Sequence, residues 1–140
     1  MKILLMTDGS SYTKRMLAYL AAHDEWLGDR HQYVVLHVVP FVPPRASAML
    51  PRAVIQSYYH DEAEKVFKPV RTFFKKQGLA ADFVAQSGNV ADVAAKIADK
   101  GGFDLIVMGS HGHGNLGNLI MGSVATRVLA RSKVPVLLVR

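Results

Sequence analysis

The amino-acid sequence predicts an α/β fold: a five-stranded parallel, doubly wound sheet of the Rossmann-like kind, with helices on both faces. Five short β-prone runs alternate with segments of helical periodicity, and this alternation implies right-handed crossovers and parallel strands. Several runs are almost continuously apolar, as strands covered on both faces are. The turn-rich tails TDGS and GSHGHG follow the first and fourth runs. We therefore favour the strand order 3-2-1-4-5, which makes these tails neighbours, over 2-1-3-4-5.

Length and composition indicate one globular domain over residues 1–140. Half of the residues are apolar and 20% are charged, and a chain of this size buries enough surface for its own core. The apolar runs fall far short of the ~20 residues that span a bilayer. The opening MKILLMTDGS has too short an apolar stretch for a secretory signal. We expect no membrane association and a cytoplasmic location.

Cysteine content and charge narrow the function classes. The chain has no cysteine, which excludes a disulfide scaffold, a thiolate metal site and a thiol nucleophile. The 17 basic and 11 acidic side chains give a net charge of +6, which favours anionic partners without indicating a fold. The densest basic groups recur at helical spacing, so we interpret them as solvated helix faces and do not expect nucleic acid as a partner. They are Lys65, Lys68, Arg71, Lys75 and Lys76 in one group and Arg127, Arg131 and Lys133 in the other.

The chain begins with a predicted strand, helix and second strand. Residues 2–6 form a short strand that ends in turn residues. Ser10 or Ser11 then caps a helix whose apolar residues recur at intervals of three and four as far as Leu27. Residues 33–39, YVVLHVV, are β-branched and nearly continuous in apolar character. This pattern is typical of a strand buried on both faces.

The middle of the chain is predicted to hold a loop, a long helix and a third strand. Four prolines between residues 40 and 51 mark the loop. The periodicity predicts a helix over residues 53–76, and Pro69 inside it predicts a kink or a break. Residues 79–86 form the third and weakest strand.

The last third of the chain continues the alternation. Asn89 or Ser87 caps a short helix that runs through Asp99 and ends at a glycine pair. Residues 103–108 form a buried fourth strand, residues 123–130 a last helix, and residues 135–139 a fifth strand. A long apolar strand at the sheet edge is an aggregation hazard unless it is covered. The last strand therefore suggests pairing with a second copy of the chain.

The stretch MGSHGHGNLGNLIMGS, residues 108–123, fits three phosphate-loop patterns. Residues 112–117 spell G-x-G-x-x-G, but no acidic residue follows about 20 residues later to bind a ribose. Residues 117–123 nearly spell a P-loop, but the lysine that meets the phosphates is missing. Both patterns fail on their context.

The third pattern is Gly109, two residues, Gly112, nine residues, and Gly122-Ser123. We expect Gly109 to let the backbone approach a ligand and Gly112 to permit a left-handed turn. Gly122 and Ser123 open the last helix, where unpaired amides and the helix dipole favour phosphate. The alternative is that the glycines merely permit tight turns and that Ser123 is an ordinary helix cap. The sequence leaves this alternative open.

These residues also carry a resemblance to a known family. A first strand ending in TDGS, a second strand LHVV, the segment MGSHG followed nine residues later by GS, and a final VPVLLVR together resemble the universal stress protein family, in its ATP-binding branch. The resemblance covers essentially the whole chain. It implies the order 3-2-1-4-5, an ATP site and a homodimer formed through the last strand.

The resemblance also implies roles for individual residues. Asp8 and the main chain of Thr7 lie beside the adenosine, the main chain of Val38 contacts the adenine edge, and Met108 and Gly109 approach the ribose and phosphates. The phosphates are held, mostly by backbone N–H groups, at Gly112, Gly122, Ser123 and Val124.

Simpler roles are open for several polar residues. Asp8 can cap the first helix without touching a ligand. We interpret His37, in a buried strand, as a hydrogen-bonded core histidine, and His111 and His113 as loop surface rather than metal ligands. Mg²⁺ is a candidate companion of ATP because it keeps its waters and uses phosphates with one or two carboxylates. Asp8 is the nearest acidic residue, and we assign no protein metal site.

Charge distribution bears on whether the site catalyses a reaction. Phosphoryl transfer uses a positioned Lys or Arg, and neither occurs between Gly109 and Val124. We therefore predict an ATP-binding regulatory or sensor module of the stress response, with at most slow ATP hydrolysis and no catalytic residue to name. Two alternatives stay open: a slow nucleotide phosphohydrolase, and a nucleotide-independent adaptor or DNA-binding protein.

Overall fold

Strands and helices alternate along the chain in the computed structural model, which describes residues 1–114, 118 and 120–140. The strands are β1 (Lys2–Met6), β2 (Gln32–Val39), β3 (Asp82–Ser87), β4 (Leu105–Gly109) and β5 (Val136–Val139). The helices are α1 (Ser11–Ala21), α2 (Pro44–Ser47), α3 (Arg52–Lys76), α4 (Val90–Lys100) and α5 (Ser123–Arg131). No helix in these described ranges is long and apolar enough to cross a membrane.

The strands form one parallel sheet in the order β3-β2-β1-β4-β5. This arrangement confirms both the predicted doubly wound fold and the predicted strand order. β1 lies at the centre, where Ile3 aligns with Tyr33 of β2 and with Leu105 of β4. The chain progresses from β1 outward on one side through β2 and β3, and on the other through β4 and β5. The direction of winding therefore reverses between β1 and β4, and open α/β sheets bind ligands at such a point.

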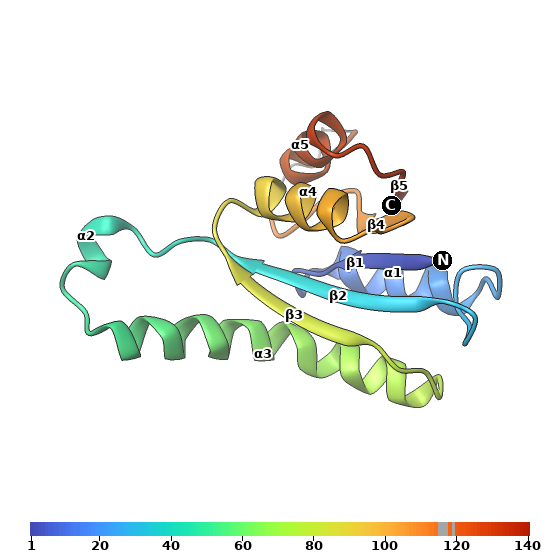
Figure 1. Ribbon diagram of the computed structural model, residues 1–140, viewed down its shortest axis with the longest axis horizontal. Helices are drawn as coiled ribbons and strands as arrows, with labels where there is room; N and C mark the ends of the chain where they lie inside the picture. The colour runs from blue at the N-terminus through green and yellow to red at the C-terminus, as the bar shows by residue number, and fades with distance from the viewer. Residues whose placement is uncertain (115–117, 119) are drawn as a thin grey trace.

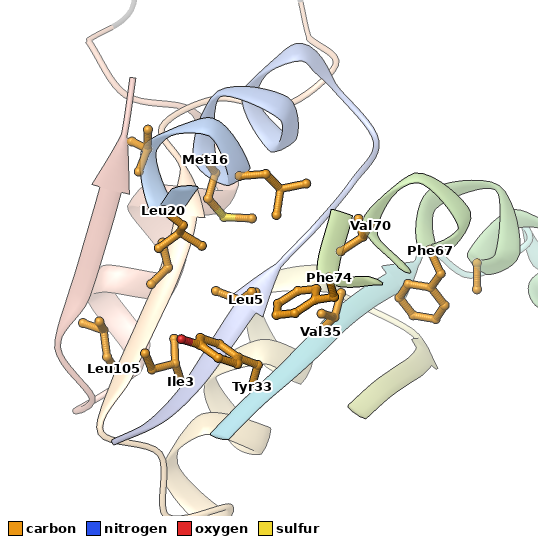
Figure 2. Packing of buried hydrophobic residues seen from close by; sticks show 14 residues of the cluster. Ile3, Leu5, Met16, Leu20, Tyr33, Val35, Phe67, Val70, Phe74 and Leu105 are labelled. Carbon is orange, nitrogen blue, oxygen red and sulfur yellow. The ribbon is translucent and has the colours of Figure 1, made fainter. Parts of the chain in front are cut away.

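Helices cover both faces of the sheet, as predicted, with α4 and α5 on one face and α1 and α3 on the other (Figure 1). Alternate residues of a strand point to opposite faces. Ile3 and Leu5 accordingly pack with α1 and α3 in the cluster that Figure 2 shows, whereas Leu4 and Met6 pack with α4 and α5. Two apolar layers therefore fix the sheet and hold the carboxyl ends of its strands in place.

Local signals set several helix ends as predicted. The hydroxyl of Ser10 accepts a hydrogen bond from the N–H of Tyr12 and caps α1. The side chain of Asn89 caps α4 in the same way. The predicted extension of the first helix to Leu27 is wrong, because α1 ends at Ala21. Leu27 still packs against the apolar cluster, from the turn that follows the helix.

Of the kink or break predicted at Pro69, the break does not occur, since α3 runs as one helix through this residue (Figure 1). The buried residues Val66, Phe67 and Val70 flank the proline, and Phe67 and Val70 pack against the sheet. This burial offsets the hydrogen bond that proline removes. The short α2, with Pro44 in its first turn, lies inside the predicted loop and was not anticipated.

Strand bounds differ slightly from the prediction. β3 begins at Asp82 rather than at residue 79, because the N–H of Leu79 is donated to the carbonyl of Phe74 in the turn after α3. β4 begins at Leu105 and extends to Gly109, where it aligns with Val139 of β5. At the predicted crevice, β1 ends at Met6 as predicted, and β4 ends one residue later than predicted.

Candidate functional site

A cavity of about 400 Å³ opens at the carboxyl ends of β1 and β4. The ends of β1, β2 and β4, the start of α5 and one side of α3 line it. Its position is the switch point between β1 and β4, where the sequence predicted a site. All nine predicted site residues line this one cavity: Thr7, Asp8, Val38, Met108, Gly109, Gly112, Gly122, Ser123 and Val124.

The first turn of α5 forms one end of the cavity. Gly122 precedes the helix and has no side chain that could cap it. Its own N–H is donated to the carbonyl of Ser110 at 2.7 Å. Within the part of the chain that the structure describes, the amides of Ser123 and Val124 have no hydrogen-bond acceptor. Two amide donors and the positive end of the helix dipole therefore face the cavity.

Two glycines of this end have packing roles that were not predicted. A Cβ atom on Gly109 would lie 2.6 Å from the Cβ of Tyr12, so Gly109 lets β4 pack closely against α1; its predicted approach to a ligand stays a prediction. Gly112 does not have a positive φ, so the predicted left-handed turn is wrong. A Cβ on Gly112 would lie 2.8 Å from Oδ2 of Asp8. Its absence lets the loop after β4 approach the loop after β1.

Asp8 performs the structural role that the sequence left open. Its Oδ1 accepts hydrogen bonds from the N–H of Ser10 and the hydroxyl of Thr13, both at 2.9 Å. These bonds fix the turn that starts α1. Oδ2 has no hydrogen-bond donor among the described residues and faces Gly112. Oδ1 of Asp8 therefore has a structural role, whereas Oδ2 is available to a ligand in the cavity.

The opposite end of the cavity is formed by the main chain of β2. The last main-chain hydrogen bond between the β1 side and β2 is donated by the N–H of Thr7 to the carbonyl of Leu36, at 2.9 Å. Alternate residues of a strand direct their main-chain groups to the same neighbour, so those of Val38 point the same way as those of Leu36. β1 pairs with β2 only as far as Leu36. The N–H and C=O of Val38 therefore face the cavity.

His37 is the hydrogen-bonded histidine that the sequence predicted. Its Nδ1 lies 2.7 Å from the carbonyl oxygen of Thr7, and its ring makes an edge contact with Phe67 of α3. The residue is half-buried rather than fully buried, and it lines the cavity. The side chain thus belongs both to the packing of β2 and to the cavity wall.

His111 and His113 lie beside the α5 end of the cavity. Nδ1 of His111 pairs with the hydroxyl of Ser110, and Nε2 of His113 lies 2.6 Å from the carbonyl oxygen of Asp8. His113 therefore joins the loop after β4 to the loop after β1. The described residues include no group of three side chains suited to hold a metal ion. No Lys or Arg is among the described residues that line the cavity.

The sequence reasoning missed one wall of the cavity. Tyr58, Glu62 and Val66 of α3 line it, and the side chain of Val66 lies 3.4 Å from the position of a Cβ on Gly9. Their spacing of four residues places them on one helix face, which was the available signal. The two discarded glycine patterns both depend on Gly117, which lies outside the described residues.

A doubly wound sheet with a ligand-sized cavity at its switch point defines the class of Rossmann-like ligand-binding domains. The model of the universal stress protein family matches residues 1–140. The chain belongs to this family. Among its relatives, universal stress protein MJ0531 of Methanocaldococcus jannaschii is 30% identical over 99% of this chain and 81% of its own length. A universal stress protein of Thermus aquaticus is 33% identical over 99% of this chain and 97% of its own.

Solved structures share the fold. The structure of protein MJ0577 of M. jannaschii superposes with a TM-score of 0.78 at 27% identity, over 99% of this chain and 94% of that one. A universal stress protein from Archaeoglobus fulgidus in complex with dAMP gives 0.69 at 20% identity, over 100% and 98%. One from Arabidopsis thaliana with AMP bound gives 0.70 at 15% identity, over 99% and 90%. At these identities the last two show a common fold.

Proposed function

We propose that residues 1–140 form a single nucleotide-binding domain that holds ATP, with Mg²⁺, and acts as a cytoplasmic regulatory module of the stress response. The observation that carries the proposal is one cavity with two amides of α5 at one end and the main chain of Val38 at the other, none of which has a hydrogen-bond partner among the described residues. The adenine nucleotides held by the two structural relatives support the choice of ligand.

The phosphates would lie against the first turn of α5. Ser123 and Val124 would donate their amides, and the exposed hydroxyl of Ser123 adds a donor. Phosphate is well suited to a helix N-terminus because several N–H groups and the dipole act on it together. Gly112 and Gly122 would allow the loop to lie close to the phosphates, although the N–H of Gly122 is already donated to Ser110.

The adenosine would occupy the end of the cavity nearer β2. The N–H and C=O of Val38 offer one donor and one acceptor to the edge of the base. The buried side chain of Met108 and the main chains of Thr7 and Gly109 would bound the base and ribose. Each of these contacts uses groups that the protein core already holds in place.

Asp8 is the residue best suited to assist a magnesium ion. Its Oδ2 faces the loop that precedes α5, and Mg²⁺ bound to nucleotides uses phosphates, waters and one or two carboxylates. The metal would neutralise phosphate charge that this cavity, without Lys or Arg among its described lining residues, does not neutralise itself.

The same lack of cationic side chains favours a binding module over a turnover enzyme. Phosphoryl transfer requires stabilisation of charge that develops on the transferred group. Without a Lys or Arg among its described lining residues, the cavity lacks a positioned cation that commonly stabilises this charge. We assign no catalytic residue and expect at most slow hydrolysis.

Calorimetric titration with ATP, AMP and adenosine in the presence of Mg²⁺ tests the proposal. Affinity should rise from adenosine to AMP to ATP, because each added phosphate meets the α5 amides and the metal. Measurable binding of ATP with equal affinity for adenosine would contradict the assignment of the phosphate end. Absence of binding by all three would contradict the proposed function.

We also propose that the domain forms a homodimer through β5. This strand lies at the edge of the sheet, and its residues Val136, Leu137 and Leu138 are only partly buried. An apolar edge with unpaired main-chain groups favours pairing with another strand. Light scattering at micromolar concentration should give the mass of two chains, and the mass of one chain would contradict the proposal.

A further inference from the structure

The hydrogen bond between His37 and Thr7 uses only one of the two ring nitrogens of His37. The carbonyl of Thr7 can only accept a hydrogen bond, so the Nδ1 atom 2.7 Å away must carry the proton. In the neutral imidazole the lone pair then lies on Nε2. The bond to Thr7 thereby fixes both the tautomer and the orientation of the ring.

The Nε2 atom is left available to a ligand. The described part of the chain supplies no hydrogen-bond partner for it. The described residues also include no buried side-chain nitrogen or oxygen that lacks a partner, so Nε2 is not sealed inside the core. His37 lines the cavity. Nε2 is therefore an accessible acceptor whose direction the protein has already set.

The neighbouring main chain defines which ligand group meets this acceptor. Val38, the next residue of β2, turns its N–H and C=O to the same cavity. The edge of adenine offers an acceptor at N1 and an amino group with two hydrogens at position 6. N1 and one amino hydrogen match the N–H and C=O of Val38. The second amino hydrogen needs another acceptor.

We propose that Nε2 of His37 is this acceptor, and that His37 is a specificity-determining residue that selects a 6-aminopurine. This inference rests on the proposed nucleotide function and adds a named side chain to it. A 6-oxopurine would bring an oxygen lone pair against the lone pair of Nε2. A purine without a 6-substituent would leave Nε2 unpaired. An acceptor left unpaired in a bound complex costs affinity.

The two nitrogens of His37 can be separated by substitution. Asparagine carries an amide nitrogen at the same number of bonds from the main chain as Nδ1. His37→Asn therefore keeps a donor for Thr7 and removes the acceptor. Glutamine carries an amide oxygen at the same number of bonds as Nε2. His37→Gln therefore keeps an acceptor for the ligand and removes the bond to Thr7.

The experiment compares the affinities of the full chain for ATP and for purine riboside 5′-triphosphate, which keeps N1 and lacks the amino group. In the parent protein ATP should bind more tightly. In His37→Asn this preference should fall about tenfold, the effect of losing one hydrogen bond. In His37→Gln the preference should be retained. A double-mutant cycle of this kind isolates the pairwise term.

Each outcome decides the inference. An unchanged preference in His37→Asn would overturn it. If His37→Asn does not fold, loss of the preference in a folded His37→Gln would overturn it, and retention would support it. A protein that binds ATP with unchanged preference keeps the proposed function and loses only the role of His37. A parent protein that binds neither nucleotide loses the proposed function itself.

Discussion

The two ends of the cavity are built in different ways. At the β2 end the available groups belong to a regular, buried strand, and the side chain of His37 is oriented by a hydrogen bond to Thr7, the residue that follows β1. At the α5 end they belong to the first turn of a helix, preceded by a glycine-rich loop. A strand in the middle of a sheet fixes donors and acceptors rigidly, which suits recognition of a base. A helix N-terminus attracts any anion, which suits it to bind phosphate without recognising the base.

Substitutions at the two ends of the cavity should have different consequences. The largest expected effect is a loss of stability caused by altered packing at Gly109. In Gly109→Val the new side chain meets Tyr12, whose Cβ would lie 2.6 Å from the added Cβ. Overpacking of this kind typically costs 1–3 kcal/mol, so we expect the free energy of unfolding to fall by about 3 kcal/mol. Urea denaturation monitored by circular dichroism measures this.

A matched control for Gly109→Val is Gly112→Ala, since Gly112 is exposed in the loop and its nearest neighbour is the end of the Asp8 side chain. That variant should stay within about 1 kcal/mol of the parent, as surface substitutions usually do. If Gly109→Val unfolds at the same urea concentration as the parent, the close contact of Gly109 with α1 does not require a glycine.

A smaller effect is expected for Asp8→Asn. The side-chain oxygen of asparagine can still accept the bonds from Ser10 and Thr13 that Oδ1 now accepts, so the stability of the protein should change little. The charge on the Oδ2 side is lost. The gain in ATP affinity on adding Mg²⁺, measured by calorimetry with and without the metal, should therefore fall about threefold, an effect typical of one partly exposed charge. The same gain in both proteins would exclude Asp8 from the metal site.

The fold could be predicted from the sequence because each strand carries its own signal. The runs around Leu4, Val35 and Ile106 are apolar on both faces, which only a covered parallel sheet explains. The errors occurred where tertiary packing overrides a local rule. Pro69 stays inside a continuous α3 because the residues on either side are buried, and α1 stops before Leu27 although the apolar pattern continues.

The site could be predicted less evenly. The position of Ser123 at the start of a helix follows from the sequence, because the glycine before it and the apolar spacing after it are local signals. The conformation of Gly112 and the contact of Gly109 with Tyr12 depend on how two loops meet, which no local pattern records. The contribution of Tyr58 and Glu62 to the cavity depends on where α3 crosses the sheet.

The α5 amides can be tested with little disturbance of the fold. A Cβ on Gly122 would lie 3.0 Å from the carbonyl of Ser110, so a larger residue there would displace the loop as well as any phosphate. Ser123 is the first residue of α5, and Gly122 before it is extended, with φ −72° and ψ 163°. Proline is favoured at a first helical position and follows an extended residue. Ser123→Pro therefore removes the amide donor together with the hydroxyl of Ser123, and it keeps the helix.

The measurement that tests the central claim most directly is calorimetric titration of Ser123→Pro with ATP and with adenosine, with Ser123→Ala as the control that removes only the hydroxyl. We predict about 30-fold weaker ATP binding for Ser123→Pro, corresponding to about 2 kcal/mol for a hydrogen bond to a charged group, with adenosine binding unchanged. Ser123→Ala should weaken ATP binding less than Ser123→Pro does, because it keeps the amide. ATP binding by Ser123→Pro at the affinity of the parent protein would contradict the claim that these amides hold the phosphates.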